Sequence, residues 1–391
     1  MNKGIRLHSI DVYRAITMIL MLWVNDFAGI TGIPHWLGHA AADEDMMGFS
    51  DIIFPTFLFC VGLSLPLALG KRLSEGGSSL KGWGHVLLRS LALIVMGLFS
   101  MNSGSVEGGL NGTWFKILMV LGFFLVWDQY PEREGKGRGI FTVLKLLGVA
   151  LLAYLVIQRV ANGAAWKVGW WGILGLIGWA YLFGAVIFLL VRGRKWLLVA
   201  AWALVALMSV ILQGKDTFFS IVPGFFTHLG LVMGGVVCTS ILSDRSFAPK
   251  RYATLWCIPV ILFALAVLCH RFWIISKIQA TPTWMFYILA LAFAMTLLLH
   301  YVCDVRGFRL WSGKGDGRSR AGDYILKPAG TATLTCYTLP YLWLALWRLF
   351  GLHWPKVLLH GGLGLVKSML FALLIVFIAG LLSNVHIKLK I

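Results

Sequence analysis

An asparagine, two histidines and five acidic residues are gathered between two strongly apolar runs near the N-terminus, in the stretch WVNDFAGITGIPHWLGHAAADEDMMGFSDIIFP at residues 23–55. His35 and His39 are the titratable bases near neutrality in this stretch. A histidine beside carboxylates is suited to abstract a proton or to accept an acyl group. The stretch is therefore the first candidate for an active site.

Three polar residues lie at the ends of the two apolar runs. Asn25 and Asp26 close the first run, and Asp51 opens the second. An aspartate at a helix start can be a simple N-cap, which accepts hydrogen bonds from free backbone N–H groups. The role of Asp51 is therefore open between a cap and a partner of a histidine, and we interpret the acidic run at 43–45 as a solvated loop.

The residue types around the cluster exclude several classes of site. His35, His39, Asp43 and Asp51 could supply metal ligands, but their spacing matches no zinc pattern, so we expect no metal. The six cysteines lie in apolar runs without a CxxC pair, which indicates neither a disulfide framework nor a zinc site. The sequence contains neither a nucleophile elbow nor a glycine-rich phosphate loop followed by lysine.

Two further charged residues lie near the start of the first apolar run, in a chain where intramembrane charges are costly. A charge at the bilayer centre costs about 2.5 to 3.5 kcal/mol on insertion scales. Asp11 and Arg14 are three residues apart on one helix face, where they could pair. A structural ion pair and a functional role are both open for them.

The chain that positions these residues has the composition of a membrane protein. Of its 391 residues, 59% are hydrophobic and 13% are charged, and the mean hydropathy is +0.82. Apolar runs long enough to cross a hydrocarbon core of about 30 Å recur throughout the chain. We expect an all-α polytopic fold, with residues 1–391 forming one transmembrane domain of about twelve helices. The expected ranges are 10–30, 51–70, 85–103, 113–130, 140–160, 170–191, 196–214, 225–243, 252–273, 283–303, 325–350 and 360–383.

The placement of the basic residues predicts the topology. If the N-terminus is cytoplasmic, the cytoplasmic segments hold most of the lysines and arginines, as the positive-inside rule expects. The basic residues left for the opposite side are Arg159, Lys167, Lys215, Arg271, Lys277 and Lys356. Both termini are therefore expected in the cytoplasm and the histidine stretch outside. The net charge of +18 reflects this topology, and we expect no binding to nucleic acid.

The motifs around the cluster resemble a known family. RLHSIDVYRAITMILMLWVNDF, a loop with histidines, and FSDIIFPTFLFCVGLSLPL are similar to the opening of the heparan-α-glucosaminide N-acetyltransferase family of membrane acyltransferases, over about the first 70 residues. Members take an acetyl group from cytoplasmic acetyl-CoA and place it on the amino group of a terminal glucosamine across the membrane. The resemblance implies this reaction here, with acetyl-CoA as donor and a glucosamine-terminated, heparan-type saccharide as acceptor.

The resemblance also implies roles for the cluster. The family's reacting histidine precedes D-[LI]-[VI]-F-P and is followed by alanine, a pattern that His39 matches better than His35. Asn25 would donate to the thioester oxygen, and Asp51 or Asp26 would orient the imidazole. His39 would either accept the acetyl group or act as general base, and both routes are open.

The phosphates of acetyl-CoA need positive charge on the cytoplasmic side. Residues 304–324 form a long, basic, Gly- and Ser-rich segment, which is either a topogenic loop or a docking surface for such phosphates. The residues that we assign to the acetyl-CoA site are Asp11, Arg14, Arg306, Arg309 and Lys327, with the basic segment 314–327.

Two other functions are open at this point. Twelve helices with both termini inside is also a common layout for a proton-coupled secondary transporter of a small polar solute, with a path along Asp11, Arg14, Asp26 and Asp51. A structural or assembly subunit is the third interpretation. We expect a bacterial member of the family in the cytoplasmic (inner) membrane, with the lipid bilayer and an amino sugar as partners and a homodimer as an open alternative.

Overall fold

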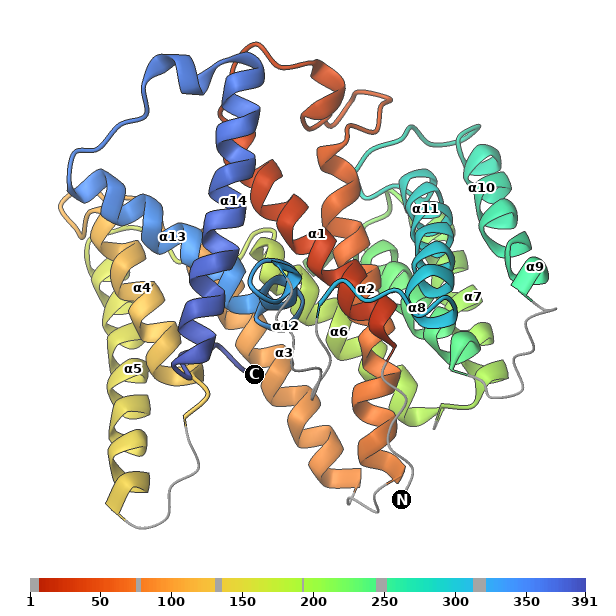
Figure 1. Cartoon of the computed structure of the whole chain (residues 1–391), viewed down its shortest axis with the longest axis horizontal. Coiled ribbons are helices and arrows are strands. Elements are labelled where there is room, and N and C mark those ends of the chain that lie inside the picture. Colours follow the sequence, from red (N-terminus) through yellow and green to blue (C-terminus); the bar gives the residue numbers. More distant parts are fainter. Residues whose placement is uncertain (1–6, 75–78, 131–135, 192, 244–251, 312–320) are drawn as a thin grey trace. The chain divides into compact units, whose positions relative to one another are not determined.

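The computed structural model describes residues 7–74, 79–130, 136–191, 193–243, 252–311 and 321–391. The regular secondary structure in these ranges is helical, without a β-strand (Figure 1). The all-α prediction is therefore confirmed for the described part of the chain. The chain divides into two compact units, and each is considered by itself.

The first unit consists of the residues up to Thr17, Pro34–Ile94 and Ile173–Arg309. Besides the first half of α1 (His8–Phe27) and most of α3 (Ser79–Met101), its helices are α2 (Ser50–Ser74), α6 (Gly172–Leu190), α7 (Lys195–Ile211), α8 (Phe225–Leu242), α9 (Tyr252–Leu255), α10 (Cys257–Cys269) and α11 (Pro282–His300). Short helical turns are η1 (His35–Leu37), η2 (Phe218–Ile221) and the π-helical η4 (Tyr301–Val305).

The second unit consists of Met18–Ile33, Val95–Gly172 and Leu310–Ile391. Besides the second half of α1 and the end of α3, its helices are α4 (Gly112–Trp127), α5 (Lys136–Ala161), α12 (Leu326–Thr331), α13 (Thr333–Leu349) and α14 (Gly361–Asn384), with the turns η5 (Ala321–Asp323) and η6 (Lys356–Leu359). The prediction of a single domain is not tested by this division and stays a prediction.

Each of the twelve predicted apolar runs coincides with a helix, but two of them are broken. The run predicted at 252–273 is divided into α9 and α10, and the run at 325–350 into α12 and α13. Within the described residues, seven helices are long and apolar enough to cross a membrane: α2, α3, α5, α6, α8, α11 and α14. The fold is that of a multi-pass membrane protein, while the count of twelve spans and the cytoplasmic termini stay predictions.

Helices α2 and α8 approach each other backbone to backbone. A Cβ atom on Gly62 of α2 would lie 1.9 Å from the carbonyl oxygen of Val232, and one on Gly235 of α8 would lie 2.2 Å from that of Phe59. Small residues permit this approach between membrane helices, where packing rather than hydrophobicity drives association. The contact fixes α2, and the first turn of α2 carries Asp51.

Helix α11 is fixed against the same end of α2. Trp284, in the first turn of α11, is fully buried, and its indole Nε1 donates a hydrogen bond to the carbonyl oxygen of Asp51 at 3.2 Å. Thr281 caps α11 by accepting from the backbone N–H of Trp284. The N-terminal ends of α2 and α11, and the loops that precede them, are therefore brought together.

We predict that Gly62→Ala destabilises the protein, because its methyl group would overlap the Val232 carbonyl oxygen and push α8 away. Overpacking of this kind costs about 1 to 3 kcal/mol. The thermal transition in detergent should therefore fall. Gly70→Ala is the matched control on the same helix, since a Cβ at Gly70 meets no atom within 4 Å. Equal stability of the two variants would contradict the close approach.

Candidate functional site

His39 and Asp51 form a hydrogen-bonded pair at the start of α2. Nδ1 of His39 lies 2.7 Å from Oδ1 of Asp51. The other carboxylate oxygen, Oδ2, accepts from the backbone N–H groups of Ala40 at 3.0 Å and Gly48 at 3.2 Å. The Asp51 side chain is 3% exposed and that of His39 is 41% exposed. A buried carboxylate thus holds an imidazole that reaches solvent.

The open question about Asp51 is answered by these partners. The two backbone groups that donate to Oδ2 belong to residues that precede α2. Asp51 therefore does not act as a simple N-cap of its own helix. It organises the preceding loop and the imidazole of His39, as expected of a histidine partner.

Lys277 completes the cluster, and no motif in the sequence points to this role. Its Nζ lies 3.1 Å from Nδ1 of His39 and 3.5 Å from Oδ1 of Asp51. The residue lies between α10 and α11, far from His39 in the sequence. The only available signal was its place among the few basic residues of the predicted outer segments, where lysine is uncommon.

The distances assign the proton on the imidazole. A neutral imidazole carries one N–H, and its short contact with a carboxylate places that hydrogen on Nδ1 of His39. The ammonium of Lys277 then pairs with Asp51 rather than donating to the same nitrogen. Nε2 of His39 has no hydrogen-bond partner within the described structure and keeps its lone pair. It is the atom able to act as a base or nucleophile.

The environment of Lys277 changes its acidity. Burial disfavours the ammonium form and lowers the pKa of Lys277 below its ordinary value of 10.5. The carboxylate of Asp51 opposes this by its charge and by a hydrogen bond. Removal of the Asp51 charge would therefore leave the Lys277 ammonium partly buried without its counter-charge, whereas Asp51 keeps His39 and two backbone donors if Lys277 is removed.

Two acidic residues tie the His39 loop in place. Asp45 accepts from His270 Nε2 and from the Ile275 backbone N–H, at 2.9 and 2.8 Å, and these hydrogen bonds lower the pKa of Asp45. Glu44 accepts from His35 and from the backbone N–H of Ala41, which lowers the pKa of Glu44. The interpretation of residues 43–45 as a solvated loop fits Asp43 and Asp45, which are exposed, while Glu44 is half-buried. The hydrogen bonds of Glu44 and Asp45 are an addition that the sequence did not indicate.

His35 differs from His39 in what holds it. Its Nε2 lies 2.6 Å from Oε1 of Glu44, and its side chain is 67% exposed. It thus pairs through Nε2 with a partly exposed carboxylate, whereas His39 is fixed through Nδ1 by a buried one. Among the described residues, no three His, Cys, Asp or Glu side chains are grouped as a metal ion would require.

Asn25 and Asp26 lie in the second unit. Asn25 is exposed near the end of α1. Asp26 pairs with Lys367 and Ser368 of α14, each at 2.6 Å from Oδ2, and the Lys367 and Asp26 side chains are both buried. Asp26 therefore pairs with residues of α14, and the carboxylate that contacts the His39 imidazole is that of Asp51. Roles of Asn25 and Asp26 in the reaction stay predictions.

The residues assigned to acetyl-CoA are distributed over both units. Asp11 and Arg14 form an ion pair at 2.8 Å, as their spacing suggested, and Arg14 also contacts Ser64 of α2 at 3.3 Å. Arg306 donates from Nε to the hydroxyl of Tyr301 at 2.9 Å. Arg309 is exposed in the first unit, and Lys327 pairs with Asp323 in the second. Residues 312–320, most of the basic segment, lie outside the described residues.

Helix α11 separates the cluster of His39, Asp51 and Lys277 from the arginines assigned to acetyl-CoA in the first unit. Lys277 precedes its start, and Arg306 and Arg309 follow its end. Its 19 residues span about 28 Å, close to the thickness of a hydrocarbon core. Asp304 also accepts hydrogen bonds from the backbone N–H groups of His8 and Ser9, so the start of α1 lies at the same end as Arg306.

A family model matches the part of the chain that carries His39 and Asp51, and two known proteins are similar to part of the chain. Residues 6–227 match the family model described as a domain of unknown function (DUF5009). The chain is similar to heparan-alpha-glucosaminide N-acetyltransferase of Mus musculus, with 28% identity over 140 residues, which cover 32% of this chain and 20% of that protein. It is 32% identical to the Homo sapiens protein of the same name over 112 residues, 29% of this chain and 16% of that protein. The chain thus spans a fifth or less of the length of these relatives.

We predict that Lys277 is more reactive towards amine-acylating reagents than exposed lysines between pH 8 and 9, because a lowered pKa increases its neutral fraction. Replacing its partner, Asp51→Asn, should lower the pKa of Lys277 further and increase labelling at the lower end of this range. Mass spectrometry after brief labelling measures both, with the exposed Lys356 as the internal reference. Slower labelling in the Asp51→Asn protein would contradict the arrangement.

We predict that Asp45→Ala loosens the loop before α11. The Ile275 amide loses its acceptor, so hydrogen exchange at residues 274–277 should rise roughly fivefold, the effect of one partly exposed hydrogen bond to a charged group. Acidification should also increase hydrogen exchange at residues 274–277. The lowered pKa of Asp45 means that its contribution is present above the ordinary value of 3.8 and is lost as pH falls through the folded-state value. Asp43→Ala, two residues away at an exposed position, should leave exchange unchanged.

Proposed function

Since the chain belongs to the DUF5009 family and is similar in part to two N-acetyltransferases, we propose that it is a transmembrane acetyltransferase. The acetyl group of acetyl-CoA passes to the amino group of a terminal glucosamine of a heparan-type saccharide. The observation that carries the proposal is the His39–Asp51 pair. Its buried carboxylate fixes Nδ1 and leaves Nε2 of a partly exposed imidazole free to react.

Nε2 of His39 is the reacting atom in either route of transfer. In the covalent route it attacks the thioester carbonyl carbon, the C–S bond breaks, and CoA leaves as its thiolate. The sugar amine then attacks the acetyl carbonyl carbon, the bond from that carbon to Nε2 breaks, and the proton that the amine nitrogen loses passes through solvent to the thiolate. In the direct route the amine attacks the thioester itself, the C–S bond breaks, and Nε2 accepts the proton that the nitrogen loses and passes it to the departing thiolate.

Asp51 and Lys277 support both routes. The Asp51 carboxylate keeps the imidazole in the Nδ1–H tautomer and stabilises the positive charge that the ring acquires. Lys277 balances that carboxylate when the ring is neutral. Asn25 is proposed to donate to the thioester oxygen as negative charge develops on it.

The donor is proposed to enter from the other end of α11. Arg306 and Arg309, which follow α11, are proposed to supply positive charge for its phosphates, while Asp11 and Arg14 form an ion pair in the first half of α1. Lys327 and the basic segment 314–327 stay proposed ligands from the sequence alone. The thioester arm then extends along the helices towards His39. This fits a chain in the inner membrane of a bacterium, with the donor in the cytoplasm and the acceptor outside.

We predict that His39→Ala lowers kcat for acetyl transfer by about 100-fold or more, the usual contribution of a catalytic base or nucleophile. His35→Ala, at the other histidine of the same loop, should stay within about threefold of the unaltered protein, since the ring it removes is largely exposed and contacts Glu44, not Asp51. The assay is formation of N-acetylglucosamine from glucosamine and acetyl-CoA by the purified protein, read by mass spectrometry. Full activity in both variants would exclude this site.

Two further measurements discriminate the alternatives. Labelled acetyl-CoA without sugar should leave acetyl on His39 if the route is covalent, and none if the amine attacks directly. A secondary transporter would leave acetyl-CoA unconsumed in detergent. The transporter alternative uses a path along Asp11, Arg14, Asp26 and Asp51, and each of these residues has a charged or histidine partner within the protein. Asp11 pairs with Arg14, Asp26 with Lys367, and Asp51 with His39 and Lys277.

A further inference from the structure

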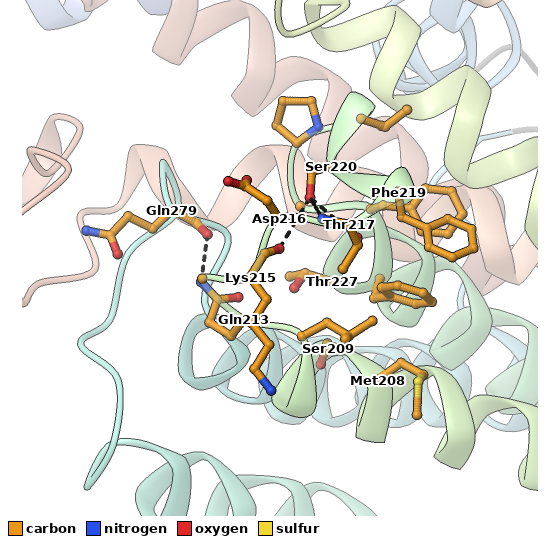
Figure 2. Close-up of a pocket in the computed structure, with 17 residues that line it drawn as sticks. Met208, Ser209, Gln213, Lys215, Asp216, Thr217, Phe219, Ser220, Thr227 and Gln279 are labelled. Carbon is orange, nitrogen blue, oxygen red and sulfur yellow. Dashed lines mark hydrogen bonds between the residues drawn. The ribbon is translucent and has the colours of Figure 1, made fainter.

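A cavity of about 380 Å³ lies beside the candidate site, at the end of α7 and the start of α8 (Figure 2). Its wall consists of the last turn of α7, the loop of residues 212–217, η2, the first residues of α8, and Gln279 from the segment before α11. All of these belong to the first unit. Under the predicted topology the cavity opens on the outer side, the side of His39.

The lining combines hydrogen-bonding groups with aromatic rings. Gln213, Thr217 and Ser220 carry groups that donate or accept hydrogen bonds, and Phe219 and Phe225 supply apolar ring surface. The rings of Phe219 and Phe225 are stacked with their centroids 5.1 Å apart, so they form one continuous apolar surface. A pocket with both kinds of surface suits a ligand that has an apolar face and several hydroxyl groups.

The charges of the lining disfavour other ligand classes. Lys215 and Asp216 are adjacent and of opposite sign, so they cancel, and the pocket carries no excess positive charge for a phosphate or a polysulfate. Neither side chain has a hydrogen bond or ion pair within the described structure. Asp216 therefore offers an unused carboxylate, an acceptor for hydroxyl groups or for the ammonium of an amino sugar.

The loop that presents Asp216 is held on both sides. Ser220 Oγ accepts from the Thr217 backbone N–H at 3.0 Å and donates to the Lys215 carbonyl oxygen at 3.3 Å. Gln213 donates from Nε2 to the carbonyl oxygen of Gln279 at 3.1 Å, which leaves its Oε1 for a ligand. The backbone that carries Asp216 and the Gln213 amide are thus held in place before a ligand arrives, which reduces the entropic cost of binding.

One short segment connects the pocket with His39. The Gln279 side chain points away from the pocket (Figure 2) and donates to the carbonyl oxygen of Ala42, in the His39 loop, at 2.7 Å. Two residues earlier, Lys277 contacts His39 and Asp51. We propose that this pocket binds a sugar ring of the acceptor saccharide, with Asp216 and Phe219 as its principal contacts. That its ligand is the acceptor rests on the proposed acetyltransferase function.

The test measures binding of glucosamine to the full chain in lipid nanodiscs by calorimetry. Asp216→Asn should weaken binding about tenfold, the loss expected when a hydrogen bond to a charged group is removed. Phe219→Leu, which keeps apolar volume but removes the ring, should weaken it about threefold to tenfold. The controls are Asp43→Asn, at an exposed loop position, and Phe218→Leu, which alters an 85% exposed ring outside the lining; both should bind as the unaltered protein does.

Turnover separates this proposal from the proposed function. In the acetylation assay, Asp216→Asn should raise KM for glucosamine and leave KM for acetyl-CoA unchanged. Unaltered glucosamine binding in both Asp216→Asn and Phe219→Leu would overturn the proposal that the pocket binds a sugar, even if His39→Ala abolishes turnover. Weakened binding in these variants, together with no acetylation by the unaltered protein, would keep the pocket as a sugar site and overturn the acetyltransferase.

Discussion

The carboxylate of Asp51 is a charge buried at the end of a membrane helix, and such a charge is tolerated only if its oxygens are fully paired. Its partners come from three separate places: the His39 ring, the backbone of the loop before α2, and Lys277 before α11. Satisfying one carboxylate therefore fixes two loops and two helix starts relative to each other. The orientation of the imidazole is a consequence of this constraint, which is why the reactive nitrogen is defined without a ligand.

The helices supply the rest of this arrangement. The glycine contact between α2 and α8 and the buried Trp284 at the start of α11 set the position of Asp51. At the opposite end of α11, Asp304 accepts from the start of α1. One unit thus has two polar ends separated by about 28 Å of apolar helix, a geometry that suits a donor bound at one end and an acceptor at the other.

The sequence predicted what depends on local pattern. Apolar runs located the helices, and short-range spacing located the Asp11–Arg14 pair and the His39–Asp51 neighbourhood. It did not predict Lys277, because a contact between segments more than 200 residues apart leaves no trace in one sequence. Hydropathy also does not reveal the breaks within the runs at 252–273 and 325–350, because the residues on both sides of each break are apolar. The pocket was missed for the same reason as Lys277: its lining converges only in the fold.

The segment Ser276–Ala280 contacts several neighbours at once. Ser276 Oγ and Gln279 Nε2 both donate to the Ala42 carbonyl oxygen, Thr227 donates to that of Ala280, and Lys277 extends to the imidazole. A ligand that shifts this segment at one end changes the electrostatic surroundings of His39 at the other. Because energetic coupling between two binding sites is reciprocal, occupancy of the imidazole by an acetyl group would alter the affinity of the cavity by the same factor. Under the two proposals, the segment Ser276–Ala280 is thus the physical link through which acceptor binding and acetylation of His39 influence each other.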